Sequence, residues 1–414
     1  MAARSPKEGA KRVLCVFGTR PEAIKMAPVV LALRDTADLQ PIVAVTAQHR
    51  SMLDQVLDAF GIEADHDLGI GREHQTLGEI TRRALEGIEG LLAETEPDLV
   101  VLQGDTTTAL SAALAGFYAK VPVAHIEAGL RTGDPMAPYP EEVNRRLISQ
   151  VAALHLAPTP SAVANLVGAG VDRGSVICTG NTVIDALSWT VSRHGVSTSG
   201  LLGDLDADGR RLVLVTVHRR ESWGRPIRGV ARALAAVAVA HPDTLILLPV
   251  HKNPVVRASL VPVLEGLTNV RLVEPLPYGE FARVLQRCHL VVTDSGGIQE
   301  EAPSLGKPVL VLRDVTERPE AVAAGTVELI GTDEAHVVQR IEDLLTDPAL
   351  YARMAQATNP YGDGRAAGRS VAAMRWLLAG GPQPEEFRPE ADPPDGAGAA
   401  ERDRPHAPRE GRVA

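Results

Sequence analysis

The sequence predicts an α/β protein built from two doubly wound domains around a central cleft. The first observation is a series of short apolar runs rich in valine and leucine, each followed by a stretch with helical spacing. Such runs are typical of parallel strands that are covered on both faces. The second observation is that the series occurs twice, in residues 13–180 and again in residues 212–331. A chain of 414 residues is long enough for two such domains.

The apolar runs give the expected strands. In the first half they are 13–18, 42–47, 99–104, 122–129, 154–159 and 176–180, and in the second half 212–217, 245–250, 270–275, 289–294, 308–313 and 326–331. We expect one domain over residues 12–180 and a nucleotide-binding domain over 181–379, with a hinge near 181–211, where Gly and Asp are frequent. From 380 to 414, Pro, Gly and charged residues replace core formers, which predicts a disordered tail.

The composition excludes several classes of protein. The formal net charge is −10 and aromatic residues make up 3% of the chain, so neither a duplex-binding surface nor a base-stacking platform is expected. Three cysteines without metal spacing predict reduced thiols in a cytoplasmic protein. The polar, basic N-terminus is not a signal peptide, and the apolar runs are too short to span a membrane.

Ligands of open α/β sheets bind beyond the carboxyl ends of the strands, so functional residues are expected there. Gly18, Arg20 and Lys25 follow the first strand and offer a tight turn with two positive charges at a helix start, either for an anion or as a solvated helix face. Asp105 follows the third strand, where a carboxylate serves catalysis or caps the next helix.

Two further carboxylates follow the fourth strand. Glu127 interrupts an apolar run, which indicates either a functional acid or a structural ion pair with Arg131. Glu141 and Arg145 are four residues apart and share a helix face, as an ordinary surface salt bridge would, unless that helix faces the cleft.

In the second half, His218 and Arg219 end the first strand and are typical of a diphosphate clamp, with the histidine as hydrogen-bond donor or acid. Ser295, Gly296 and Gly297 follow a later strand and leave the backbone N–H groups free to approach a phosphate.

One helical turn beyond that glycine pair, Glu301 could accept hydrogen bonds from ribose hydroxyls, although acids are common in a first helical turn in any case. Arg318, after the next strand, adds a contact to phosphate or ribose. No strand is followed by a GxGxxG turn, so we expect no dinucleotide cofactor, and the histidines lack zinc spacing, so we expect no metal.

These motifs, taken in order, resemble those of the non-hydrolysing UDP-N-acetylglucosamine 2-epimerases. The matching segments are FGTRPEAIKMAP, TAQHRSMLDQVL, GDTTT, EAGLRTGD, PEEVNRR, GNTVIDAL, HRRES, DSGGIQEEAPSLGKPVLVLRDVTERPEAV and NPYGDG. The resemblance runs from about residue 12 to residue 365. It implies two Rossmann-like domains of the glycosyltransferase-B type. It also implies a cytoplasmic homodimer, without cofactor, that supplies cell-wall polysaccharide synthesis.

The implied reaction is the reversible C2 epimerisation of UDP-N-acetylglucosamine to UDP-N-acetylmannosamine, by elimination and re-addition of UDP through 2-acetamidoglucal. Residues that match the family's proton-transfer and diphosphate positions are Asp105, Glu127, Glu141 and His218. Arg20, Lys25 and Arg145 match other active-site positions, and Ser295, Glu301 and Arg318 match UDP contacts.

The sequence also departs from the family pattern. Gln103 stands where a histidine is expected, and Val217 stands where Gly or Ala is usual. An allosteric activator subsite is matched by Gln48 and His251 but not by Ser51 and His74. Two other functions remain open: a hydrolysing 2-epimerase that releases N-acetylmannosamine and UDP, and a glycosyltransferase of the same fold.

Overall fold

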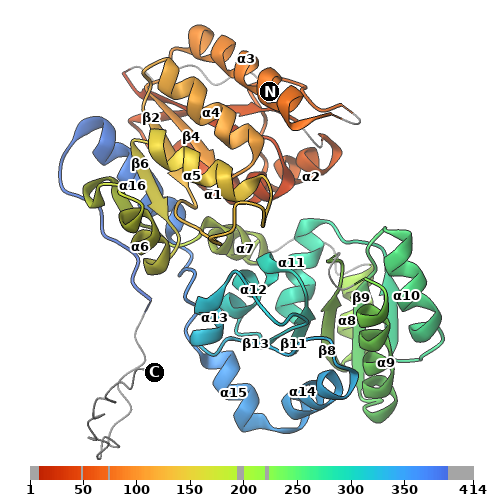
Figure 1. Cartoon of the computed structure of the whole chain (residues 1–414). Coiled ribbons are helices and arrows are strands. Elements are labelled where there is room, and N and C mark those ends of the chain that lie inside the picture. Colours follow the sequence, from red (N-terminus) through yellow and green to blue (C-terminus); the bar gives the residue numbers. More distant parts are fainter. Residues whose placement is uncertain (1–8, 48–49, 73–74, 194–199, 220–222, 390–414) are drawn as a thin grey trace, which may run out of the picture.

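The computed structural model describes residues 9–47, 50–72, 75–193, 200–219 and 223–389. Within these ranges the strands form two parallel sheets, one of seven strands and one of six. Each sheet lies between helices, and Figure 1 shows the two α/β units one above the other, with helix α7 (Thr182–Ser192) at their junction. The predicted doubly wound α/β class is confirmed.

The first sheet has the strand order β3-β2-β1-β4-β5-β6-β7. Its strands are β1 (Lys11–Phe17), β2 (Leu39–Val45), β3 (His66–Asp67), β4 (Leu99–Gln103), β5 (Val123–Ile126), β6 (Leu154–Ala157) and β7 (Val176–Cys178). Its helices are α1 (Arg20–Asp35), α2 (Arg50–Phe60), α3 (Leu77–Thr95), α4 (Thr107–Tyr118), α5 (Glu141–Val151) and α6 (Pro160–Gly168), with a 3-10 turn at Arg173–Ser175. Sequence analysis missed β3, because two polar residues form no apolar run.

The second sheet has the order β10-β9-β8-β11-β12-β13. Its strands are β8 (Arg211–Thr216), β9 (Thr244–Pro249), β10 (Val270–Val273), β11 (Leu290–Thr293), β12 (Val309–Val311) and β13 (Val327–Leu329). Its helices are α8 (Leu201–Asp208), α9 (Arg225–Ala240), α10 (Pro254–Leu264), α11 (Tyr278–Arg287), α12 (Gly296–Glu301), α13 (Pro319–Ala323), α14 (Glu334–Thr346) and α15 (Pro348–Gln356), with a 3-10 turn at Ala302–Leu305. The last helix, α16 (Ala366–Ala379), follows this sheet in sequence.

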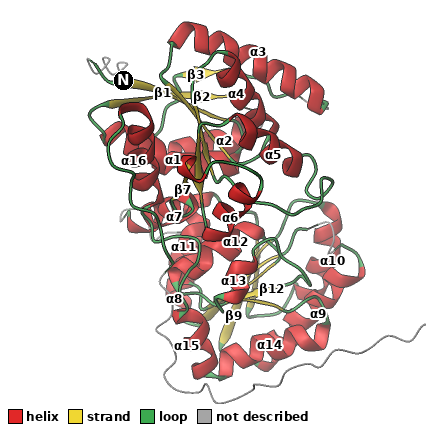
Figure 2. Ribbon diagram, turned by 60° about the vertical axis from the view of Figure 1, so that its left-hand side comes forward, coloured by secondary structure: helices red, strands yellow, loops and turns green. Residues whose placement is uncertain are grey.

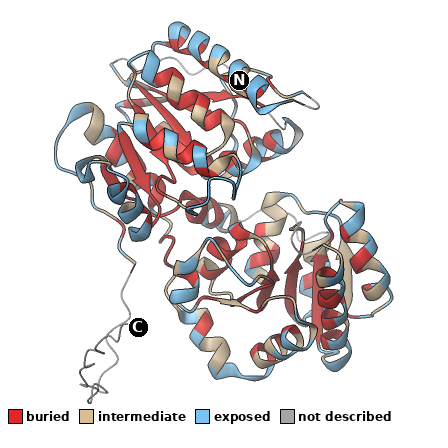
Figure 3. Cartoon of the chain, in the orientation of Figure 1, coloured by how far each residue is buried: buried red, intermediate tan, exposed pale blue. Residues whose placement is uncertain are grey.

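Alternating side chains on the central strands fill a core on each face of each sheet. On β1, Val13, Cys15 and Phe17 pack with α1 and α2, whereas Leu14 and Val16 pack on the opposite face with α3 and α4. Strand β8 divides its side chains in the same way between α9 on one face and α11 on the other. Burial on both faces explains why these strands are continuous apolar runs. Figure 2 shows the strands between helices, and Figure 3 shows that the strands are buried while the outer faces of the helices are exposed.

Helix α7 packs against both units, although it lies in the stretch expected to be a hinge. Its Ala186 belongs to a core of the first sheet, and its Val183 belongs to a core of the second. Asp185 of α7 accepts backbone hydrogen bonds from Ala366 and Ala367, which anchors the start of α16. Burial raises the pKa of Asp185 to about 6. The division near residue 180 stays a prediction, and residues 194–199 of the expected hinge lie outside the described ranges.

Helix α16 returns the chain to the first unit, where it packs on α1 (Figure 1). Residues 380–414 were expected to be disordered; residues 390–414 lie outside the described ranges, but within residues 380–389 Glu386 and Phe387 contact the first sheet. Phe387 is buried and its N–H donates to the carbonyl of Cys178 at 2.7 Å, so this segment covers the edge strand β7. A lone aromatic residue in a Pro-rich stretch gave too weak a signal to predict this.

No helix in the described part of the chain is long and apolar enough to cross a membrane. The thiols of Cys15, Cys178 and Cys288 are free and buried.

Candidate active site

The strand order reverses between β1 and β4 in the first sheet and between β8 and β11 in the second, and most candidate residues lie near these two points. The loops after β1 and β4 diverge to opposite faces of the first sheet, and the loops after β8 and β11 do so in the second. A crevice forms where neighbouring loops diverge in this way. Sequence analysis assigned functional residues to all four loops.

In the first sheet, a buried carboxylate ties the two diverging loops together. Glu22 accepts hydrogen bonds from the N–H groups of Gly18 at 3.1 Å and Thr19 at 2.8 Å, and from the hydroxyl of Thr106 at 2.7 Å. An added Cβ on Gly18 would lie 2.0 Å from the hydroxyl oxygen of Thr46, so only glycine fits there. The hydrogen bonds to Glu22 fix the start of α1 and therefore the direction in which Arg20 and Lys25 point.

Glu127 lies just beyond β5 in the left-handed backbone region, with φ of 62°. Its Oε2 accepts hydrogen bonds from the Lys25 ammonium and from the side-chain amide of Gln103. Although burial opposes it, the Glu127 carboxylate raises the pKa of Lys25, so the ammonium stays charged. The alternative pairing with Arg131 is wrong, because that guanidinium donates to the Leu130 carbonyl and to Ser149.

Asp105 pairs with Arg145 at 2.6 Å, and Asn144 donates to the Asp105 carbonyl at 2.8 Å. Helix α5 therefore faces this edge of the sheet, which was the condition for a functional role of Arg145. Asp105 is not a helix cap, since the hydroxyl of Thr106 caps α4. Burial raises the pKa of Asp105 against the opposing effect of Arg145 and Lys25.

Glu141 begins α5, and its charge also raises the pKa of Asp105, which places the two acids near each other. The expected salt bridge between Glu141 and Arg145 does not form. Arg145 instead contacts Glu142, a buried acid that sequence analysis overlooked. Glu142 also accepts the N–H groups of Thr132 and Gly133, so it holds the loop that leads into α5. The Glu141 carboxylate forms no hydrogen bond or ion pair with any described residue, which leaves it available to a ligand.

In the second sheet, a buried aspartate organises the loop after β8. Asp294, with a fully buried side chain, accepts the N–H groups of His218 and Arg219 at 2.8 Å each. Its other oxygen lies 3.0 Å from Nδ1 of His218, which leaves Nε2 of the imidazole directed elsewhere. Although burial opposes it, the hydrogen bond from His218 lowers the pKa of Asp294. The orientation of His218 thus depends on the aspartate that precedes Ser295.

Ser295 precedes the short helix α12, which Gly296 and Gly297 begin as predicted, and Arg318 lies close to Gly296. An added Cβ on Gly296 would lie 2.7 Å from an Arg318 nitrogen, so any larger residue there would displace this guanidinium. Arg318 pairs with Glu300 at 2.6 Å and with Glu317 at 3.0 Å.

The adjacent acids Glu300 and Glu301 have different environments. Glu300 is paired with Arg318 and accepts a hydrogen bond from Asn181 at 2.9 Å, so its two oxygens are both engaged. Glu301 has only the hydroxyl of Tyr278, at 3.3 Å, among the described residues. Burial, and then the charge of Glu300, raise the pKa of Glu301 to about 7. Glu301 is therefore the acid that a ligand can satisfy.

Glu317 is a functional candidate that sequence analysis missed. It pairs with Arg219 at 3.2 Å, with Arg313 at 2.8 Å and with Arg318 at 3.0 Å, and so joins the loops after β8 and β12. Burial opposes ionisation, but the charge of Arg318 lowers the pKa of Glu317 to about 2. An acid followed by an arginine in a polar loop carries no sequence signal for such a role.

Residues from the two sheets lie close together. Lys25 and Arg20, from the first unit, lower the pKa of Glu301 in the second, and Glu127 raises that of Arg318. The side chain of Glu320 also forms hydrogen bonds between the two units.

The hydrogen bonds of Glu320 join helix α13 of the second unit to the start of α6 in the first. Glu320 accepts hydrogen bonds from Ser161 and, at 3.2 Å, from Thr159. The structure thus brings the predicted catalytic acids and the predicted phosphate-binding loops to one interface.

The proposed activator subsite is only partly described. His251 stacks on His218 with 6.0 Å between ring centroids, whereas Gln48 and His74 lie outside the described residues, as do residues 220–222. Among the residues that are described, no group of three or more His, Cys, Asp or Glu side chains could hold a metal ion.

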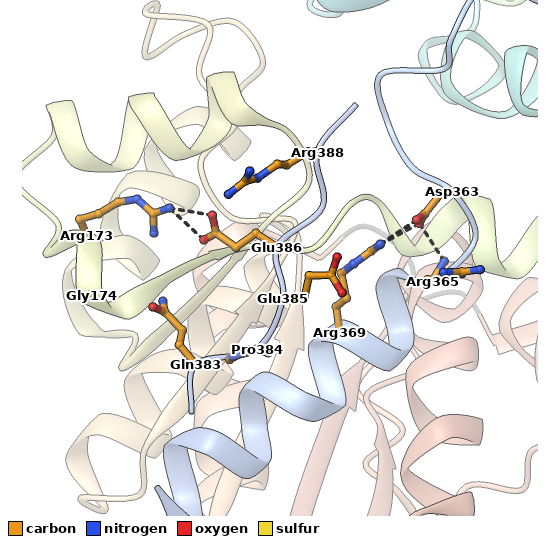
Figure 4. Close-up of a pocket in the computed structure, with 10 residues that line it drawn as sticks. All are labelled: Arg173, Gly174, Asp363, Arg365, Arg369, Gln383, Pro384, Glu385, Glu386 and Arg388. Atoms are coloured by element: carbon orange, nitrogen blue, oxygen red, sulfur yellow. Dashed lines mark hydrogen bonds and ion pairs between the residues drawn. The ribbon is translucent and has the colours of Figure 1, made fainter. Parts of the chain in front are cut away.

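A charged pocket of about 920 Å³ lies elsewhere, between α16, the 3-10 turn at Arg173–Ser175 and the segment after α16 (Figure 4). Two of its four arginines form ion pairs within it, Arg173 with Glu386 and Arg369 with Asp363. It contains none of the predicted site residues.

Known proteins resemble this chain over most of its length. The family model for UDP-N-acetylglucosamine 2-epimerase matches residues 31–375. The UDP-N-acetylglucosamine 2-epimerase of Escherichia coli strain K12 is 50% identical over 370 residues, covering 88% of this chain and 98% of the relative. That of Bacillus subtilis strain 168 is 50% identical over 360 residues, covering 87% and 94%. The structure of the Neisseria meningitidis enzyme bound to UDP-GlcNAc superposes with a TM-score of 0.80 at 45% identity, covering 88% and 99%.

The different environments of Glu300 and Glu301 lead to a stability prediction. We expect Glu300→Gln to lower the free energy of unfolding by about 2–3 kcal/mol, because a buried Arg318 loses one of its two charged partners. Glu301→Gln should leave it unchanged or raise it at pH 8, because the neutral amide removes a buried charge whose desolvation no ion pair relieves. Urea denaturation of both variants at pH 8 measures this. Equal losses in the two variants would show that the assignment of roles is wrong.

Proposed function

This chain belongs to the UDP-N-acetylglucosamine 2-epimerase family, and on that premise we propose that it interconverts UDP-N-acetylglucosamine and UDP-N-acetylmannosamine without releasing free sugar. The observation that carries the proposal is the placement of the carboxylates Asp105 and Glu127, each held by a cation, opposite the Arg318 and Glu301 loops of the second sheet. Inversion at C2 needs proton transfer on both faces of the sugar, beside a stabilised diphosphate.

The chemistry of the substrate favours elimination. The hydrogen on C2 is not acidic, because C1 is an acetal carbon. If the bond from C1 to the UDP oxygen breaks first or early, its electron pair leaves with the diphosphate and the C2 proton becomes acidic. A carboxylate removes that proton and the C1–C2 double bond of 2-acetamidoglucal forms. Protonation of C2 from the opposite face and re-addition of UDP at C1 complete the inversion, so no water is consumed.

The carboxylates of the site suit different proton-transfer steps of this mechanism. Glu127, which accepts hydrogen bonds from Lys25 and Gln103, suits the role of the base that removes the C2 proton. Asp105, whose pKa burial raises, suits a group that carries a proton to the other face, with Glu141 beside it. The roles of donor and acceptor exchange in the reverse direction.

The loops of the second sheet suit the leaving diphosphate. His218, Arg219 and Arg318, with the backbone at Ser295–Gly297, would stabilise its charge, as Arg20 and Lys25 would from the first unit. Glu301 would accept the ribose hydroxyls. The contacts of Glu320 across the two units support retention of the glycal, which favours the non-hydrolysing reaction over a hydrolysing one.

A glycosyltransferase of this fold is the other candidate. It would use the same nucleotide-binding loops, but it would leave the cluster of Asp105, Glu127 and Glu141 without a task. Family resemblance also supports a homodimer that acts in the cytoplasm and supplies N-acetylmannosamine units for cell-wall polysaccharide.

The decisive experiment is proton NMR of the purified protein with UDP-GlcNAc in D₂O. We expect UDP-ManNAc to appear with deuterium at C2 in both sugars, while UDP remains attached at equilibrium, because elimination and re-addition exchange the C2 proton with solvent. Free N-acetylmannosamine with one equivalent of UDP would instead identify a hydrolysing enzyme. Binding of UDP-GlcNAc with no exchange at C2 would contradict epimerisation and favour a transferase.

The proposed acids can be tested by substitution. We expect Asp105→Asn and Glu127→Gln each to lower kcat by about 10²–10⁴-fold while UDP-GlcNAc affinity is largely kept, because each removes a proton-transfer group and not a binding contact. Kinetics and calorimetric titration separate the two effects. Glu86→Gln on the exposed face of α3 is the control and should leave both unchanged. Turnover near the wild-type rate in either variant would remove that residue from the mechanism.

Nucleotide binding should depend on pH through Glu301. Its pKa of about 7 means that the free protein carries a proton there at pH 6, whereas a ribose contact needs the carboxylate. We therefore expect the Kd for UDP to rise as pH falls below 7, by up to about tenfold per unit, because binding must release the proton. In Glu301→Gln that contribution should vanish. The comparison by calorimetry from pH 5.5 to 8.5 is informative, since identical slopes in the two proteins would refute this role.

A further inference from the structure

Gln103 is the last residue of β4 and is buried, with 4% of its surface exposed. It lies in register with Ile126 on the neighbouring strand β5, one residue before Glu127. Parallel pairing at this point brings the amide of Gln103 to the Glu127 carboxylate from within the sheet. The resemblance to other epimerases assigns no role to a glutamine at this position, where a histidine was expected.

The two donors that reach Glu127 share one oxygen. Both Lys25 Nζ and Gln103 Nε2 contact Oε2, and Oε1 receives no hydrogen bond from any part of the chain that the structure describes. The carboxylate group rotates easily about the bond that joins it to the rest of the side chain, so a single hydrogen bond would not fix the direction of its second oxygen. Two donors from different elements, Lys25 on α1 and Gln103 on β4, do fix that direction.

The backbone of Glu127 favours its contact with β4. It is in the left-handed region, which is unusual for a residue other than glycine, and the side chain reaches the amide of Gln103 from there. Arg131, the nearest arginine in sequence, is occupied by Ser149. The ammonium of Lys25 supplies charge, whereas the neutral amide of Gln103 supplies direction.

We propose that Gln103 is a positioning residue of the reaction, which together with Lys25 fixes Oε2 of Glu127 and leaves Oε1 as the oxygen that exchanges the proton with C2. The inference rests on the proposed function, because it requires Glu127 to act on the substrate. Gln103 itself touches neither substrate nor proton. A one-ångström error in placing a catalytic group is enough to cost about 10²-fold in rate.

The test compares three substitutions of Gln103. Gln103→Met keeps the length and removes the donor, Gln103→Asn keeps the amide but is one methylene too short, and Gln103→His restores an N–H near the same place. We expect Met and Asn to lower kcat by about 10–100-fold with little change in KM, and His to recover much of that loss. The acid limb of the kcat–pH profile should move to higher pH in Met, because the ionised carboxylate loses a hydrogen bond.

A purely structural role for Gln103 gives a different pattern. Met would then lower the melting temperature, while kcat and the pH profile of the folded protein stay at the wild-type values, and that result would overturn the proposal. If Met does not fold, Asn and His together still decide, since equal kcat in both would refute positioning. Deuterium exchange at C2 by the wild-type protein separates the two proposals. Its absence overturns the proposed function and this inference with it, whereas exchange that Met leaves unchanged overturns this inference alone.

Discussion

The contact between Lys25 and Glu127 joins the first helix of the chain to the end of strand β5, across the centre of the first sheet. A carboxylate that is almost fully buried at this position would be too costly without a partner. The ammonium relieves that cost, and burial of the lysine in turn requires the acid. The position of α1 is thereby tied to that of β5, and Gly18, Glu22 and the loop after β4 must be arranged to suit.

The same requirement is met differently in the second unit. There most of the acids hold protein groups: the buried Asp294 holds the His218 loop, and the buried Glu300 and the more exposed Glu317 hold Arg318. These fixed pairs leave Glu301 as the acid with the weakest protein partner. Because a paired acid costs less to bury than an unpaired one, the site keeps its desolvation cost at the residue where a ligand can relieve it.

The fold and much of the site could be predicted from the sequence. Strands buried on both faces are recognisable as apolar runs, and functional residues follow them because loops at the carboxyl edge are the place for ligands. The sequence could not show which side chains pair. Asn181 and Glu300 are far apart along the chain, as are Arg219 and Glu317, and nothing local marks either contact. The packing of Phe387 and the two-residue strand β3 were not predicted for a different reason. Each is a local feature, but its pattern is too short to stand out from its polar surroundings.

Three tryptophans occur in the chain, and their placement makes the protein its own optical probe. Trp223 donates its indole N–H to the carbonyl of His218 at 3.3 Å, so its emission senses the loop at the end of β8. Trp189 stacks on Phe60 of α2 with 4.5 Å between ring centroids, beneath the guanidinium of Arg193, and senses the junction of the two units. Trp376 lies on α16 and packs against a core of the first sheet. Variants that keep a single tryptophan therefore separate events at the loop from events at the junction, without any attached label.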